Sequence, residues 1–362
     1  MSVTEDHVRA LLSRVTDPNT GLDLVSGGQV RGVGIDGDKV AVDVVLGYPA
    51  ASWHATLAGM IEGVLRADPA ISAASASVSS RVLAHEVRKG VNPLPGVKNV
   101  IAVASGKGGV GKSTTAVNLA LALVAEGARV GVLDADIYGP SIPRMLGLTG
   151  RPETVENKRI VPMRAHGLEA MSIGFLIDED TPMIWRGPMV TQALQQLLND
   201  TLWQDLDYLV IDLPPGTGDI HLTLCQRVPV SGALIVTTPQ DIALLDARKA
   251  LKMFEKVEVP VLGIVENMAI HVCSNCGHAE HIFGSGGGER MASQYDVPLL
   301  GSLPLDIRIR EQADGGTPTV ASQPDSAAAV SYRDIARKAA GRLSLRARSK
   351  SIAFPNIVVR DD

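Results

Sequence analysis

One nine-residue segment restricts the possible folds of this chain more than any other. Residues 106–114 read GKGGVGKST and fit G-x-x-x-x-G-K-S/T, the pattern of a phosphate-binding loop. A mostly apolar run over 97–104 precedes the segment and predicts a buried strand. Ser113 to about Glu126 predicts a helix, and Gly127 is its expected stop. A glycine loop between a buried strand and a helix is the context in which this pattern binds nucleotide phosphates.

Each residue type in the loop has a chemical reason to be there. The glycines let successive backbone N–H groups face phosphate oxygens, and the following helix presents its positive end to the same anion. Lys112 is expected to reach the β- and γ-phosphates, and the Ser113 hydroxyl to ligate Mg²⁺. The residues predicted to bind the nucleotide here are Gly106, Lys107, Gly108, Gly109, Val110, Gly111, Lys112, Ser113 and Thr114.

Four more apolar runs follow the loop and alternate with helical segments. They cover residues 130–133, 208–211, 233–237 and 261–265, and polar residues follow each of them. This order predicts βαβ units and a parallel sheet, which binds ligands at the carboxyl ends of its strands. Aromatic residues make up only 3% of the chain, so aliphatic side chains must build the core, as suits strands buried on both faces. We expect an α/β fold, a parallel-sheet P-loop NTPase domain preceded by a small α+β domain.

Carboxylates stand at the ends of two of these runs. Asp134 and Asp136 form the string DAD, and two carboxylates at a strand end near a phosphate loop can orient water and outer-shell ligands of Mg²⁺. Asp212 follows the run at 208–211 and is expected to hold Mg²⁺ through water. Residues 214–216 read PPG and predict a stiff loop with a hinge, suited to sensing the γ-phosphate.

Two of the three cysteines stand close together. Only two residues separate Cys273 and Cys276, and thiolates at this spacing can bind one soft metal centre together. Two ligands are too few for a closed tetrahedral or cubane site. Either two chains each supply a pair, or His271, His278 and His281 provide the missing ligands for zinc within one chain. A redox disulfide is a third reading, and the spacing alone leaves all three open.

The residues before the loop show a different pattern of apolar and polar side chains. Thr4 is a candidate cap for a first helix, Val40–Leu46 and 77–83 alternate as strands do, and a second helical stripe begins at Trp53. The predicted organisation is a small α+β domain over 1–88, a linker over 89–96, a nucleotide-binding domain over 97–345 and a C-terminal tail over 346–362.

Charge and composition exclude several classes of protein. The net charge of −5 with interspersed signs is not that of a nucleic-acid binder, and no run approaches about 18 apolar residues, as a membrane span would require. No signal or transit peptide is visible. Three cysteines in a chain of this length indicate a reducing compartment, so we expect a cytoplasmic protein with Cys225 as a small buried side chain. The basic stretch 337–350 is interpreted as a solvated helix face.

Seven strings occur in an order that resembles one family. They are GKGGVGKST (106–114), DADIYGPS (134–141), WRGPM (185–189), DLPPGTGD (212–219), VENM (265–268), CSNCG (273–277) and IFGSGGG (282–288). Over about 97–345 the chain is similar to the Mrp/ApbC family, cytosolic P-loop ATPases that carry iron–sulfur clusters. The resemblance implies that Cys273 and Cys276 of two subunits bridge one 4Fe–4S cluster in a homodimer. It also implies cluster transfer to apo iron–sulfur proteins, with cluster-assembly factors as further partners.

The wider MinD/ParA superfamily supplies candidate roles in ATP hydrolysis. Lys107, directly after the first glycine, resembles the lysine that reaches across a dimer to the nucleotide of the partner subunit, as an arginine finger does. Asp136 resembles the residue that activates the attacking water, and Asp134 the one that supports Mg²⁺. The expected catalytic residues are therefore Lys107, Lys112 and Asp136.

The base is expected to be adenine. The chain has no N-K-x-D string, which GTP-binding proteins of this class use to read guanine. Asn267 resembles an adenine-reading residue, and Pro304 and Asp306 lie in what resembles a base-covering loop. ATP and Mg²⁺ are the expected nucleotide and metal.

The N-terminal residues resemble a small SufT-like iron–sulfur-assembly domain. The Asp17-Pro18 turn, the alternating strand and the helix from Ala50 carry this likeness. Many such domains have a cysteine near the start of the second helix, where this chain has Ala50-Ala51-Ser52. We therefore interpret the domain as a docking module without a thiol function.

Two other functions compete with the cluster carrier. The first is a MinD/ParA-type positioning ATPase with a structural zinc site, against which the cysteine pair and the lack of a clear terminal amphipathic helix argue. The second is a nucleotide-dependent electron donor like the nitrogenase iron protein. Such proteins place their cluster cysteines near the second switch strand, and residues 207–219 contain none.

Overall fold

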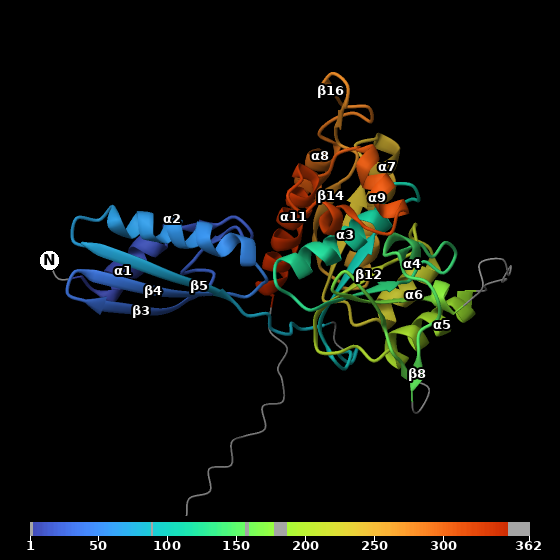
Figure 1. Cartoon of the computed structure of the whole chain (residues 1–362), viewed down its shortest axis with the longest axis horizontal. Helices are drawn as coiled ribbons and strands as arrows, with labels where there is room; N and C mark the ends of the chain where they lie inside the picture. Colours follow the sequence, from blue (N-terminus) through green and yellow to red (C-terminus); the bar gives the residue numbers. More distant parts are fainter. Residues whose placement is uncertain (1–2, 88–89, 156–158, 177–186, 347–362) are drawn as a thin grey trace, which may run out of the picture.

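The computed structural model describes residues 3–87, 90–155, 159–176 and 187–346. A small sheet with its own helices lies beside a larger α/β unit (Figure 1). Residue 89 of the predicted linker and residues 347–362 of the predicted tail fall outside the described residues, as do Trp185 and Arg186 of the WRGPM string.

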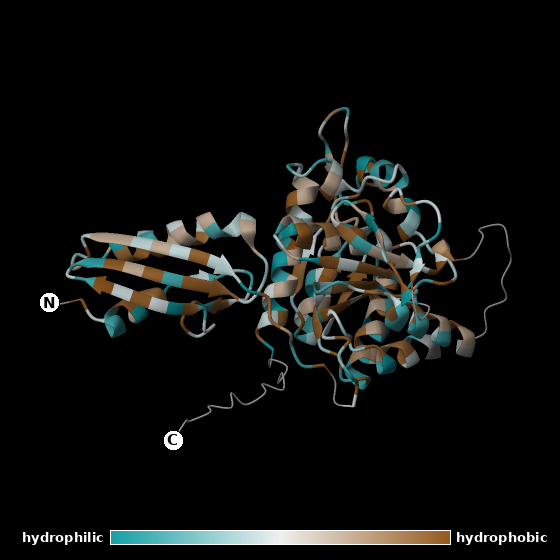
Figure 2. Ribbon diagram, turned by 60° about the horizontal axis from the view of Figure 1, so that its bottom comes forward, coloured by the Kyte–Doolittle hydropathy of each residue, from teal (hydrophilic) through white to brown (hydrophobic). Residues whose placement is uncertain are grey.

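Three strands make the small sheet in the order β3-β4-β5. They are β3 (Val30–Asp36), β4 (Lys39–Leu46) and β5 (Ala73–Ser80), with β3 antiparallel and β5 parallel to β4. Helices α1 (Glu5–Leu12) and α2 (His54–Arg66) pack on it, and a short hairpin joins β1 (Thr16–Asp17) to β2 (Leu22–Asp23). Figure 2 shows the alternation of apolar and polar residues along these strands.

In this region the predicted helix cap is confirmed, whereas the predicted bounds of one strand are wrong. The side chain of Thr4 accepts a hydrogen bond from the backbone N–H of His7, so its role as helix cap is confirmed. The strand predicted over 77–83 has the wrong bounds. It begins at Ala73 and ends at Ser80 because its parallel pairing with β4 runs over that length, which the alternation in the sequence does not encode.

The large sheet has eight strands in the order β10-β11-β7-β12-β6-β13-β14-β17. Apart from the antiparallel pair β10–β11, all neighbours are parallel, which confirms the expected fold class. The strands are β6 (Val97–Ala104), β7 (Val130–Asp134), β10 (Met163–Ala165), β11 (Leu168–Ser172), β12 (Leu206–Asp212), β13 (Gly232–Thr237), β14 (Val261–Glu266) and β17 (Leu299–Ser302).

Helices cover both faces of this sheet, and each face has its own apolar cluster. One cluster holds buried residues of α3 (Lys112–Ala125), α4 (Ile142–Met145), α10 (Thr319–Ser322) and α11 (Ala327–Ser344). The other holds those of α5 (Gly187–Asp200), α6 (Asp219–Arg227), α7 (Asp241–Lys256) and α8 (Gly287–Tyr295). The buried residues of the small sheet join the first cluster, so one apolar core extends through both units. No helix in the described ranges combines the length and the apolarity that crossing a bilayer requires.

A buried ion pair ties the small unit to the large one. The Arg337 guanidinium of α11 donates to Glu126 Oε1 at 2.6 Å and to Ser52 Oγ at 2.7 Å. Ser52 in turn donates from its hydroxyl and its backbone N–H to the two oxygens of Glu126. The solvated face predicted for 337–350 is therefore wrong at Arg337, which is only 9% exposed. Its partners come from residues 52 and 126, which sequence reasoning had no means of placing beside it.

Candidate functional site

The phosphate-binding loop lies between β6 and α3, as expected. Gly109 and Gly111 both have φ of +80°, a left-handed conformation that side chains other than glycine rarely adopt. A Cβ on Gly111 would stand 2.2 Å from Asn267 Nδ2, which donates to the Val110 carbonyl at 2.8 Å. On the other side, a Cβ on Gly106 would stand 2.1 Å from the backbone of Asp246 in α7. A side chain at either position would clash, so both must be glycine. The hydrogen bond from Asn267 also places this residue at the loop.

Lys112, Ser113 and Asp212 form one cluster at the start of α3, in which Lys112 and Asp212 are buried and Ser113 is half-buried. The Lys112 ammonium is 2.5 Å from Asp212 Oδ1 and 3.2 Å from the Ser113 hydroxyl. Burial raises the pKa of Asp212, and the Lys112 charge opposes this shift. The second oxygen of Asp212 is buried without a hydrogen-bond partner. A buried carboxylate oxygen that lacks a donor, next to a hydroxyl, suits a hard cation such as Mg²⁺.

Asp134 is fully buried at the end of β7 and adjacent to this cluster in the sheet, because its register partner in β12 is Asp212. Burial, and then the Asp212 charge, raises the pKa of Asp134 to about 7. Both of its oxygens accept hydrogen bonds. The donors are the N–H groups of Asp136, Ser141 and Ile142 and the hydroxyl of Ser172. Asp134 therefore holds together the loop that carries Asp136.

A cavity of about 490 Å³ lies between that loop and the turn after β12. Asp136 and Tyr138 line it from the first side, and His221 together with the residues from Pro214 to Gly218 lines it from the other. Burial is the main cause that raises the pKa of Asp136. Sequence reasoning missed His221. The only signal was a histidine in the first turns of the helix that follows the PPG loop.

Lys107 lies near the start of α7. Its ammonium is 3.5 Å from Gln240 Oε1. In the first turns of this helix Ile242 is 70% exposed and Leu245 is 53% exposed. Two apolar side chains three residues apart on this helix are therefore open to solvent.

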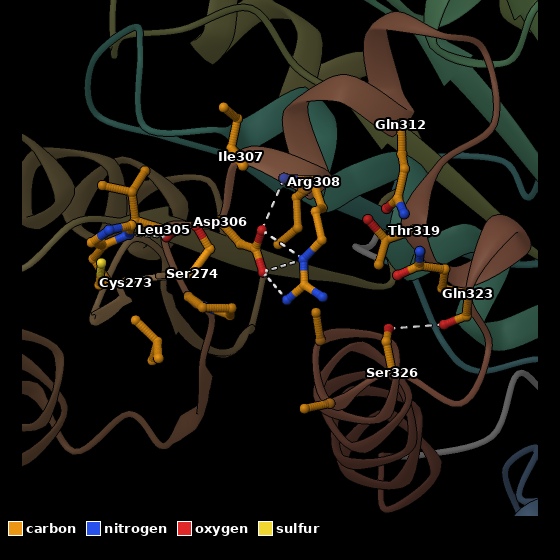
Figure 3. Close-up of a pocket in the computed structure, with 16 residues that line it drawn as sticks. Cys273, Ser274, Leu305, Asp306, Ile307, Arg308, Gln312, Thr319, Gln323 and Ser326 are labelled. Atoms are coloured by element: carbon orange, nitrogen blue, oxygen red, sulfur yellow. Dashed lines mark hydrogen bonds and ion pairs between the residues drawn. The ribbon is translucent and has the colours of Figure 1, made fainter. Parts of the chain in front are cut away.

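A second cavity, of about 640 Å³, is lined by residues 271–274, by the loop 304–306, by α9 (Ile307–Asp314) and by the start of α11 (Figure 3). Asp306 caps α9 and pairs with Arg308. Gln312 and Thr319 also line the cavity, and each has a buried side-chain oxygen without a hydrogen-bond partner. Unpaired buried oxygens in a cavity wall suit a ligand with polar edges, such as a base and a ribose.

The cysteine pair forms the turn of a hairpin between β15 (His271–Val272) and β16 (Ala279–Glu280), which projects from the large unit (Figure 1). Cys276 is exposed and Cys273 half-buried, and both thiols are free. Backbone N–H groups of Cys276 and Asn275 lower the pKa of Cys273. Cys225 lies elsewhere, buried in α6, and burial raises its pKa to about 12.

The nearby histidines hold the hairpin through backbone carbonyls. His271 Nδ1 donates to Leu305 O at 3.0 Å, and His281 Nδ1 donates to Ala269 O at 2.7 Å. Within the part of the chain that the structure describes, no group of three or more His, Cys, Asp and Glu side chains is placed to hold a metal ion.

This arrangement can be compared with known proteins. Residues 96–340 match a family model described as NUBPL iron-transfer P-loop NTPase, which covers more than half of the chain. The chain belongs to this family. Residues 5–78 match a second model, described as iron-sulfur cluster assembly protein, and these residues hold the small sheet up to β5. Both likenesses stated from the sequence are thereby confirmed.

Relatives in this family are similar over most of the chain. The iron-sulfur cluster carrier protein of Haemophilus influenzae is 51% identical over 94% of this chain and 92% of its own length. The protein of the same name from Escherichia coli K12 is 63% identical over 68% of both chains. The mouse iron-sulfur cluster transfer protein NUBPL is 53% identical over 69% of this chain and 79% of its own.

Solved structures agree with the fold. A nucleotide-binding protein of Archaeoglobus fulgidus in complex with ADP is 39% identical, has a TM-score of 0.55, and matches 61% of this chain and 87% of its own. The cell division ATPase MinD of Pyrococcus furiosus, 24% identical with a TM-score of 0.52 over 66% of this chain and 97% of its own, supports the fold alone.

Proposed function

We propose that this protein is an ATP-dependent iron–sulfur cluster carrier, which binds and hydrolyses ATP and transfers a cluster to apoproteins. One observation carries the proposal. The cysteine hairpin and the loop 304–306 are joined by two hydrogen bonds, from Leu305 N–H to Ile270 O at 2.8 Å and from His271 Nδ1 to Leu305 O at 3.0 Å. A change in the nucleotide site that moves this loop therefore moves Cys273 too.

The loop 106–114 would hold the phosphates, with Lys112 on the β- and γ-phosphates. Asn267 and the cavity behind Pro304 and Asp306 would receive the adenine and ribose, because the cavity walls carry unpaired polar atoms. Lys107 would act on the nucleotide of a partner subunit, and Asp136 would activate the attacking water.

Ser113 and Asp212 would hold Mg²⁺, with Asp134 in the outer shell because hydrogen bonds already occupy both of its oxygens. When bound, Mg²⁺ neutralises the charge that develops on the phosphates.

The cluster is the cargo, and one chain supplies two thiolates for it. A 4Fe–4S cluster needs four ligands, so Cys273 and Cys276 would share it with the same pair of a second subunit. The exposed apolar residues beside Lys107 support a homodimer whose contact surface includes the start of α7. The free thiols support action in the cytoplasm, where such thiols stay reduced. Apo iron–sulfur proteins and cluster-assembly factors would be the partners, and the N-terminal unit a docking module.

The test is anaerobic purification with iron, sulfide and zinc analysis and a visible spectrum. We expect about two iron and two sulfide per chain, because one 4Fe–4S cluster would serve two chains. Cys273→Ala/Cys276→Ala should lose the iron yet still bind ATP, whereas the matched control Cys225→Ala should keep it. Stoichiometric zinc without iron would refute the carrier and favour the positioning ATPase with a structural zinc site.

A further inference from the structure

His221 is held in one tautomer by the turn after β12. Its Nε2 is 2.7 Å from the Pro214 carbonyl oxygen. Because a carbonyl oxygen only accepts, Nε2 carries the proton, and Nδ1 of the neutral ring is left as an acceptor. The ring is 6% exposed, and its Nδ1 is buried without a hydrogen-bond partner.

An unpaired buried acceptor is costly, by about 1–3 kcal/mol, and native proteins rarely keep one without a use. His221 lines the 490 Å³ cavity opposite Asp136 and Tyr138. Burial is the main cause that lowers the pKa of His221, and the Lys112 charge lowers it further. The carbonyls of Pro214 and Gly218 and the charge of Asp136 oppose this shift. The ring is therefore neutral near pH 7, with its acceptor available to a ligand in the cavity.

We propose that His221 is a further catalytic residue, which positions the water that attacks the γ-phosphate of ATP. This inference rests on the role proposed above for Asp136. His221 Nδ1 accepts a hydrogen bond from one O–H of the water, and Asp136 takes the proton of the other. The water oxygen bonds to the γ-phosphorus as the bond to the bridging oxygen breaks. That electron pair leaves with ADP, and the products are ADP and inorganic phosphate.

The same hydrogen bond makes His221 dependent on the shape of the turn. Gly216 in this turn has φ of +103°, and a Cβ there would stand 3.8 Å from the His221 ring. A movement of the turn that withdraws the Pro214 carbonyl removes the group that orients the ring. Water positioning therefore depends on the turn that is expected to sense the γ-phosphate.

Two variants separate this role from a structural one. His221→Gln keeps a donor for the Pro214 carbonyl but has no acceptor at the Nδ1 position, whereas His221→Asn keeps an acceptor near Nδ1. We expect His221→Gln to lower kcat by about 10²-fold with little change in the KM for ATP. His221→Asn should lose clearly less. Both should bind ADP as the parent protein does, since neither nitrogen is part of the phosphate-binding loop.

A double-mutant cycle with Asp136→Asn connects the two residues. Because both act on one water, the loss in kcat of His221→Gln/Asp136→Asn should be smaller than the product of the two single losses. A kcat for His221→Gln within twofold of the parent would overturn the proposal, as would a change in KM alone. A normal kcat for Asp136→Asn would instead overturn the role of Asp136. The iron and sulfide content described above tests the cluster carrier independently of both kinetic results.

Discussion

At the scale of single residues, close packing decides what the phosphate-binding loop tolerates. The Asn267 amide stands where a side chain on Gly111 would have to go, while nothing lies within 4 Å of a Cβ on Gly108. Gly111 is a fixed position of the loop pattern and has a φ of +80°, whereas Gly108 occupies a variable position and has no positive φ.

Gly111→Ala should therefore destabilise the nucleotide-free protein by about 1–3 kcal/mol, from backbone strain and the clash with Asn267. Gly108→Ala should change the free energy of unfolding by less than about 0.5 kcal/mol. Urea denaturation without nucleotide measures both. Equal losses in the two variants would show that the loop does not have this packing.

The three cysteines differ in reactivity because their surroundings differ in burial. A pKa of about 12 leaves Cys225 about a thousandth of the thiolate that an ordinary thiol has, because burial disfavours the charged form. In the cluster-free protein, iodoacetamide near pH 8 should label Cys273 and Cys276 well before Cys225, as peptide mass spectrometry can establish. Labelling of Cys225 at a similar rate in the folded protein would contradict its burial.

At the scale of elements, α3 connects the two ends of the larger unit. It begins at Lys112 in the nucleotide site, and Glu126 directly after it binds Ser52 and Arg337, roughly 20 Å away by the rise of a helix of this length. The docking point of the N-terminal unit is thus set on the helix that carries the phosphate-binding loop.

Arg337→Met should lower the free energy of unfolding by about 3 kcal/mol, because it leaves the Glu126 carboxylate buried without its cation. Arg333→Met, at a half-buried position of the same helix, is the matched control and should cost less than about 1 kcal/mol. Denaturant unfolding compares them, and equal values would mean that the buried pair adds nothing beyond an ordinary side chain.

At the scale of the whole molecule, the cysteine hairpin and the start of α7 both leave apolar side chains open to solvent. Val272 and Ile282 near the hairpin are about half exposed, like Leu245 in α7. In the proposed homodimer, each chain would supply two cysteine thiolates to the shared cluster and these apolar side chains to the contact.

Ile242→Lys/Leu245→Lys should weaken the proposed homodimer by about tenfold or more and lower the iron bound per chain, because the new charges would have to be buried. Met60→Lys, a change at an exposed methionine of α2, is the control. Light scattering with chromatography reports the mass. An unchanged dimer would place the contact elsewhere.

Local chemistry made much of this protein predictable from its sequence. The phosphate-binding loop, the buried strands and the paired cysteines are short patterns formed by residues close together in the sequence. For this reason β6 was predicted over the residues it occupies, and the ends of α3 to within one residue. The order of the strings was enough to indicate the family.

Only the tertiary structure decided the features that join distant residues. The burial of Arg337 depends on Ser52 and Glu126, and the free nitrogen of His221 depends on the carbonyl of Pro214 and on the cavity it shares with Asp136. The bounds of β5 depend on pairing with β4. None of these contacts leaves a periodic or composition signal in the sequence, because each arises from the packing of segments whose separation along the chain says nothing of their distance in space.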